Sequence, residues 1–163
     1  MISDRVHETR VIRTALPADA QAITDLHHRA RSTYYPDGIP DDGTDWLAVW
    51  QGAIARPKAY VLCLLDQGRI VALASFRTPE GEPAETVKLF QFHVDPDQWR
   101  SGLGTALHAA CLEQWRADGR RTVVLDVHVD NERAQAFYVR QGWVAEPADG
   151  SHHLEMRLAV TGE

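Results

Sequence analysis

Residues 89–106 read LFQFHVDPDQWRSGLGTA, and they combine three local signals in one short segment. The segment begins with residues typical of a β-strand, which end at Asp95 and Pro96. A loop with glycines at positions 102 and 104 follows and opens into a helical pattern. A strand, a glycine loop and a helix start in this order can direct several backbone N–H groups at one anion. The segment therefore predicts an anion-binding site.

Outward from this segment, the spacing of apolar residues predicts the other elements. Helical spacing follows Leu103 and recurs at residues 20–34, after Trp46 and after Asn131. Strand patterns occupy residues 11–15, 59–65, 69–76, 86–94, 122–129, 143–146 and 153–159. The resulting order, β-α-α-β-β-β-α-β-α-β-β, predicts an α/β fold with a mixed sheet. The sheet is expected to be antiparallel first, with a right-handed parallel step over residues 87–129.

Composition narrows the class of protein. The chain has 163 residues, which predicts a single domain over residues 1–163 with a loose segment at 1–10. Its net charge of −6 argues against a nucleic-acid partner. Apolar runs are too short to span a membrane, and the charged start lacks the apolar region of a signal peptide. Cys63 and Cys111 lack metal-site spacing, so we expect neither a disulfide nor a metal, and a cytoplasmic location.

Two common phosphate-binding motifs do not fit the glycine loop. Leu107 stands where a dinucleotide-binding fingerprint requires its third glycine. No Gly-Lys-Ser/Thr sequence follows, so the loop is not a Walker loop. These mismatches count against a nucleotide-binding module.

Two motifs together resemble the GNAT superfamily of N-acetyltransferases. Residues 94–107, VDPDQWRSGLGTAL, resemble the family's signature loop, in which V-x-P ends a strand and Q/R-x-x-G-x-G/A begins a helix. Residues 131–143, NERAQAFYVRQGW, resemble its N-x-x-A-x-x-F-Y-x-x-x-G-F segment. The resemblance is strong over residues 87–143 and loose elsewhere. It implies the GNAT-like acyl-CoA N-acyltransferase fold and acetyl-CoA as cosubstrate.

The resemblance also implies how that cosubstrate is held. Its pyrophosphate would lie on the N–H groups of residues 99–105, and its pantetheine arm would pair with the backbone of residues 92–94. Asn131 matches a residue that often contacts the arm. Its alternative role is a plain helix N-cap, and both roles can hold together. The implied contacts are Phe92, Val94, Trp99, Arg100, Ser101, Gly102, Leu103, Gly104, Thr105, Asn131 and Ala134.

Catalytic roles follow from the same resemblance. The Val94 N–H would polarise the thioester carbonyl, and Tyr138 matches the general acid that protonates the departing thiolate. A core tyrosine on an amphipathic helix is the alternative for Tyr138. His93 is a weak candidate for the base, while Asp126 and His128 are more simply interpreted as structural or solvated residues.

Three positions depart from the family pattern. Trp99 stands where glutamine or arginine is usual, and Ser101 where a basic residue is common. These changes would make the anion site depend more on backbone N–H groups and on Arg100. Lys88 stands where some members carry a glutamate base.

The acceptor is the least determined part of the function. The resemblance implies direct attack by a primary amine of a small molecule or a peptide, in a monomer or homodimer. The acidic segment 37–45 is interpreted as a solvated loop, with a rim that attracts a cationic acceptor as the alternative. A transferase of a longer acyl group and a non-catalytic acyl-CoA sensor are the rival functions. The adjacent pairs His27-His28 and His152-His153 are interpreted as incidental.

Overall fold

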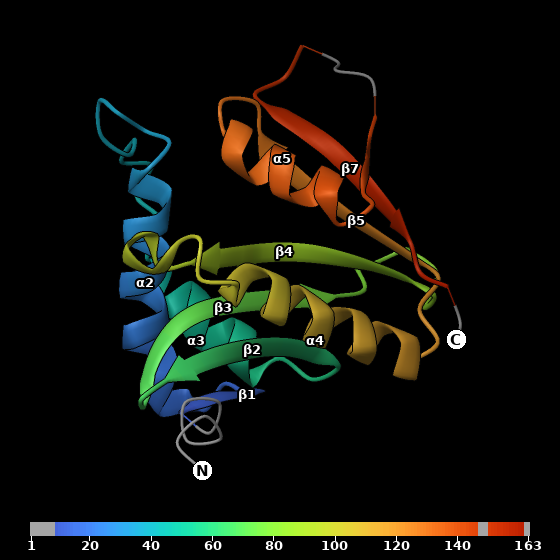
Figure 1. Cartoon of the computed structure of the whole chain (residues 1–163), viewed down its shortest axis with the longest axis horizontal. Coiled ribbons are helices and arrows are strands. Elements are labelled where there is room, and N and C mark those ends of the chain that lie inside the picture. Colours follow the sequence, from blue (N-terminus) through green and yellow to red (C-terminus); the bar gives the residue numbers. More distant parts are fainter. Residues whose placement is uncertain (1–8, 147–149, 162–163) are drawn as a thin grey trace. The chain divides into compact units, whose positions relative to one another are not determined.

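The computed structural model describes residues 9–146 and 150–161. Within them the strands follow the order β1-β2-β3-β4-β5-β7-β6 in one sheet of seven strands (Figure 1). The elements are β1 Arg10–Thr14, η1 Pro17–Asp19, α2 Ala20–Ser32, α3 Trp46–Ala55, β2 Ala59–Asp66, β3 Arg69–Arg77, β4 Thr86–Val94, η2 Pro96–Gln98, α4 Leu103–Ala117, β5 Thr122–His128, α5 Glu132–Arg140, β6 Val144–Ala145 and β7 His153–Ala159. Two compact units divide the chain: one holds residues up to Ser75 together with Gln91–Cys111, and the other holds Phe76–Phe90 and the residues from Leu112 on.

In the first unit, α2 and α3 pack on the first strands. β1 pairs antiparallel with β2, and the β2–β3 turn has Gln67 and Gly68 at φ 53° and 78°, the conformation of a tight hairpin turn. The apolar stripe of α2 supplies Ile23 and Leu26, which pack in a core with Trp50 of α3. At the start of α2, the Leu16 N–H donates to the Asp19 carboxylate at 2.7 Å.

In the second unit, β5 is the central strand. The beginning of β4 pairs parallel with it, and β7 pairs antiparallel along its whole length. Figure 1 shows α5 running alongside β5 and β7. The fully buried Trp115 ring lies 5.4 Å from the Phe76 ring and 6.4 Å from the Trp143 ring, measured between centroids. These aromatic rings form the centre of this unit's core.

The predicted fold class and element order are confirmed, including the parallel β4–α4–β5 step. β4 and β7 have the predicted bounds, whereas α2 ends at Ser32 rather than near Tyr34. Of the predicted loose segment 1–10, residues 1–8 lie outside the described residues, and Arg10 already belongs to β1. Cys63 and Cys111 are buried free thiols. Within the described ranges, no helix is long and apolar enough to cross a membrane.

Candidate active site

The ladder between β4 and β5 is short. It pairs Thr86–Lys88 with Thr122–Val124 and then stops, although β4 continues to Val94. The end of β4, residues 92–94, therefore carries backbone groups that the β5 ladder does not use. These are the residues on which the resemblance places the pantetheine arm.

Asp95 anchors the end of β4. Its side chain is 4% exposed and forms an ion pair with Arg29 of α2. Its backbone N–H donates to the Val71 carbonyl at 2.8 Å, and its carboxylate accepts the Asp97 N–H at 3.0 Å. A buried carboxylate that is paired and hydrogen-bonded in this way fixes the chain direction at this point.

Two of the residues that depart from the family pattern hold the glycine loop in place. The Trp99 indole N–H donates to the Val94 carbonyl at 3.2 Å, and the Ser101 hydroxyl donates to the Gln98 carbonyl. Arg100 and Gly102 have φ values of 70° and 80°. A Cβ built on Gly102 has nothing within 4 Å, so its backbone conformation, rather than packing inside the chain, explains the glycine.

The start of α4 has backbone donors that the helix itself does not use. Ala106 is the first residue whose N–H bonds back into this turn, to the Gly102 carbonyl at 3.0 Å. The N–H groups of Leu103, Gly104 and Thr105 precede it and have no partner within the helix. No acidic side chain occurs in the first turn. The buried Leu103 side chain anchors the turn, and this arrangement fits a phosphate group.

The second motif forms the start of α5 in the other unit. The Asn131 side-chain oxygen accepts the Ala134 N–H at 3.2 Å, so Asn131 is a helix N-cap, as one of its two predicted roles requires. The Tyr138 side chain is 6% exposed, and its ring lies 5.5 Å from the rings of both Phe137 and Trp143. This burial matches the alternative of a core tyrosine, and the role of general acid remains a prediction.

The candidate bases on the strands have structural partners. The Lys88 ammonium lies 3.0 Å from the Asp126 carboxylate, so each neutralises the other's charge. His128 Nδ1 accepts the Asp130 N–H at 3.1 Å. The structure thus agrees with the interpretation of Asp126 and His128 as structural or solvated residues.

His93 is half-buried near the end of β4. Its Nε2 lies 2.7 Å from the Gln91 side-chain oxygen, which assigns the proton to Nε2 and leaves Nδ1 as the acceptor. Burial, with smaller contributions from the charges of His27 and Arg31, lowers the His93 pKa to about 3. The ring is neutral at physiological pH and binds a proton weakly, which makes it a poor base for an ammonium group.

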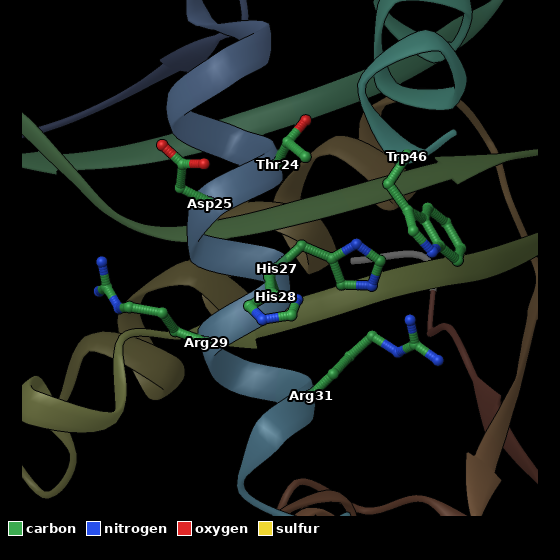
Figure 2. Close-up of a pocket in the computed structure, with 7 residues that line it drawn as sticks. All are labelled: Thr24, Asp25, His27, His28, Arg29, Arg31 and Trp46. Carbon is green, nitrogen blue, oxygen red and sulfur yellow. The ribbon is translucent and has the colours of Figure 1, made fainter. Parts of the chain in front are cut away.

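A pocket of about 340 Å³ lies on α2 and the start of α3 (Figure 2). Its lining residues are Thr24, Asp25, His27, His28, Arg29, Arg31 and Trp46. The pair His27-His28, interpreted above as incidental, belongs to this wall. The sequence did carry a signal, because residues 24, 27, 28 and 31 share one face of a helix by their spacing.

The buried histidines predict acid sensitivity. His27 and His108 are each 2% exposed, and burial lowers the pKa of each from 6.5 to about 4. The unfolded chain binds these protons at higher pH than the folded chain does, so stability is complete above pH 6.5 and decreases as pH falls toward 4. The unfolding free energy should fall by about 1.4 kcal/mol per pH unit for each histidine.

Urea denaturation between pH 7 and pH 4.5 measures this slope. His108→Leu should reduce the change of unfolding free energy with pH by about 1.4 kcal/mol per pH unit, which is the contribution of one buried histidine. A stability that stays flat between pH 6.5 and 4.5 would contradict the neutral, buried state of these rings.

The family model described as the Acetyltransferase (GNAT) family matches residues 20–143. The matched span runs from the first residue of α2 to the segment after α5, and so includes both motifs. The chain therefore belongs to the GNAT family of acetyltransferases.

Among the relatives, a mycothiol acetyltransferase of Saccharopolyspora erythraea is 28% identical over 138 residues, covering 80% of this chain and 41% of the relative. The chain spans less than half the length of the curated relatives it matches. The PaiA N-acetyltransferase of Thermoplasma acidophilum, solved with coenzyme A, has a TM-score of 0.76 at 15% identity, over 92% of this chain and 98% of that one. The yncA protein of Salmonella typhimurium, solved with acetyl-CoA, has a TM-score of 0.74 at 21% identity. The match covers 95% of this chain and 96% of that one. At these identities the two structures establish the fold.

Proposed function

We propose that this chain is an acetyl-CoA-dependent N-acetyltransferase that acetylates a primary amine of a small molecule or peptide. One observation carries the proposal: β4 continues past its ladder with β5 and leads directly into a glycine loop held by hydrogen bonds and into the first turn of α4, which has no acidic side chain. This is the arrangement that an extended arm ending in a pyrophosphate would use, and membership of the GNAT family supports it.

The loop and helix start would hold the pyrophosphate through backbone groups. The N–H groups of Leu103, Gly104 and Thr105 and the exposed Arg100 side chain supply donors and positive charge. The edge of β4 at residues 92–94 would pair with the amides of the pantetheine arm, as an added strand pairs with a sheet edge. The Trp99 indole positions this edge, because it holds the Val94 carbonyl.

The acetyl-CoA thioester supplies an acetyl group with a thiolate leaving group. The amine nitrogen bonds to the carbonyl carbon, the C–S bond breaks, and the nitrogen loses a proton. The Val94 N–H would donate to the carbonyl oxygen, and the Tyr138 phenol would protonate the thiolate. His93 stays the proposed base in its neutral form, accepting at Nδ1, although its pKa of about 3 makes it a weak one. The proposed setting is a cytoplasmic monomer or homodimer, and the free cysteines support that compartment.

A second candidate is an acyl-CoA sensor without catalysis. The burial of the Tyr138 ring favours it, since a general acid must reach the leaving group. The two functions share the cofactor contacts and differ only in turnover. A transferase of longer acyl groups is a variant of the first candidate.

A coenzyme A release assay distinguishes these functions. The protein is incubated with acetyl-CoA and amines, aminoglycosides, polyamines, amino acids or peptides, and free thiol is measured against a control without acceptor. Acceptor-dependent thiol release is the expected result. Coenzyme A binding without release for any acceptor would support the sensor, and faster release from butyryl-CoA would support the longer acyl group.

A further inference from the structure

The pocket on α2 has a basic wall and the size of a small metabolite. Its volume of about 340 Å³ lies at the lower end of the range for ligand pockets. Two arginines and two histidines line it, against the single carboxylate of Asp25. Figure 2 shows the Arg31 guanidinium on the same side of α2 as the rings of His27 and Trp46, with Asp25 and Arg29 on the other side.

The partners of these charges single out Arg31. Arg29 is paired with the buried Asp95, and the Asp25 carboxylate accepts a hydrogen bond from Gln21 at 3.0 Å. In the part of the chain that the structure describes, no carboxylate lies within ion-pair distance of Arg31. The charge of Arg31 also attracts the exposed Asp42 carboxylate, which accepts the Thr44 N–H at 3.0 Å and forms no ion pair with Arg31. Arg31 therefore brings to the pocket a positive charge that has no ion-pair partner among the described residues. The Asp25 carboxylate keeps its negative charge, because its Gln21 partner is neutral.

Aromatic rings hold the Arg31 guanidinium in place. Its central carbon lies 5.3 Å from the Trp46 ring centroid and 5.6 Å from that of Tyr35. Stacking of this kind uses the faces of the guanidinium. The guanidinium also donates a hydrogen bond to the Tyr34 side chain, so the remaining N–H groups are the ones that an anion would use. His27 adds a donor to the same wall, because its Nδ1 accepts the Trp50 indole N–H at 3.1 Å and its proton is therefore on Nε2.

The pocket wall adjoins the end of β4 within the same unit. The His27 ring lies 4.8 Å from the His93 ring, and Arg29 pairs with Asp95. These two β4-end residues flank Val94, the residue expected to contact the acetyl group. An acceptor anchored in the pocket could thus present its amine toward the reacting carbonyl.

The acidic segment 37–45 does not form the pocket wall. The carboxylates of Asp41, Asp42 and Asp45 accept backbone N–H groups of Gly43, Thr44 and Ala48 at 3.0–3.1 Å. These are local turn and capping contacts, which agree with a solvated loop. The charged residues that line the pocket are Arg29, Arg31 and Asp25, and none of them belongs to this segment.

We propose that Arg31 binds a carboxylate of the acceptor, and that the acceptor is therefore an amino acid or a similarly small amine that carries a carboxylate. The inference rests on the proposed acetyl transfer and adds the class of acceptor. A planar carboxylate matches the guanidinium fork, and the neutral His27 Nε2–H provides a further donor.

Matched acceptor pairs test this proposal. Initial rates of acetyl transfer are measured for L-amino acids and for the corresponding amino-acid amides, which keep the amine and lose the charge. The acids should have the higher kcat/KM.

Arg31→Gln should lower kcat/KM for the acids roughly 10- to 100-fold, mainly through KM, and leave kcat/KM for the amides unchanged. Arg31→Lys should cause a smaller loss. Arg56→Gln removes an exposed arginine outside the pocket and should change neither series.

A binding measurement separates failure of this inference from failure of the proposed function. Calorimetry compares N-acetyl-L-amino acids with their amides on the wild type and on Arg31→Gln. Carboxylate binding that depends on Arg31 without any turnover would support the pocket and overturn the transferase. Turnover with equal kcat/KM for acids and amides, or an equal effect of Arg31→Gln on both, would overturn the carboxylate anchor. The absence of any carboxylate binding that depends on Arg31 would also overturn it. Thermal unfolding of each variant confirms that the variant is folded.

Discussion

Replacing Tyr138 with phenylalanine should reduce kcat for acetyl transfer roughly 100-fold or more, the range that a general acid contributes. The variant loses only the phenolic O–H, so the leaving thiolate would lose its proton donor. The Kd for coenzyme A, measured by calorimetry, should remain within about twofold, because the pyrophosphate and the pantetheine arm are assigned to other residues. Loss of turnover without loss of affinity is the signature of a group that acts on the reacting atoms.

Packing is the competing explanation for any effect at this position. The Tyr138 ring is buried beside Trp143, and phenylalanine keeps that ring contact, so the thermal unfolding temperature should change little. Tyr60→Phe in β2 removes a hydroxyl outside both motifs and should retain turnover. If Tyr138→Phe is as active as the wild type at its pH optimum, Tyr138 is a core tyrosine and not the acid.

Replacing Gly104 with tryptophan should abolish measurable coenzyme A binding. Gly104 is the second residue of α4, in the turn whose N–H groups would hold the pyrophosphate. An indole at this position would occupy the space over those donors. Tryptophan is also a better helix former than glycine, so the helix itself should tolerate the change. Calorimetry at a concentration that saturates the wild type should show no binding heat.

Gly52→Trp provides a matched control within another helix. Gly52 is exposed in α3, and a Cβ there has nothing within 4 Å. This variant carries the same added side chain and should bind coenzyme A as the wild type does. Wild-type affinity in Gly104→Trp would exclude the first turn of α4 as the phosphate site.

Much of the architecture was predictable because its signals are local. The period of apolar residues in α2 placed Ile23 and Leu26 in the core, where the structure has them. Asn131 begins α5 as an N-cap through a contact only three residues away. The two motifs identified the GNAT family, which the match over residues 20–143 confirms.

The candidate site was predictable only in part. The sequence located the glycine loop, and it predicted from Trp99 and Ser101 that the anion site depends more on backbone N–H groups and on Arg100. The structure shows both residues pinning the loop, through hydrogen bonds to Val94 and Gln98. The residue types showed that these two side chains can donate hydrogen bonds. Which carbonyl each of them bonds depends on the direction of the side chain, which only the structure shows.

By itself, the sequence determined the order of elements, the parallel step around α4 and the family, because periodicity, capping and turn residues act over a few positions. Only the tertiary structure decided which charges remain uncompensated. Arg29 is neutralised by Asp95 and Lys88 by Asp126, while Arg31 meets aromatic faces and has no carboxylate partner among the described residues. Such pairings join residues far apart in the chain, and ionic interactions depend on separation in space and on burial rather than on sequence distance.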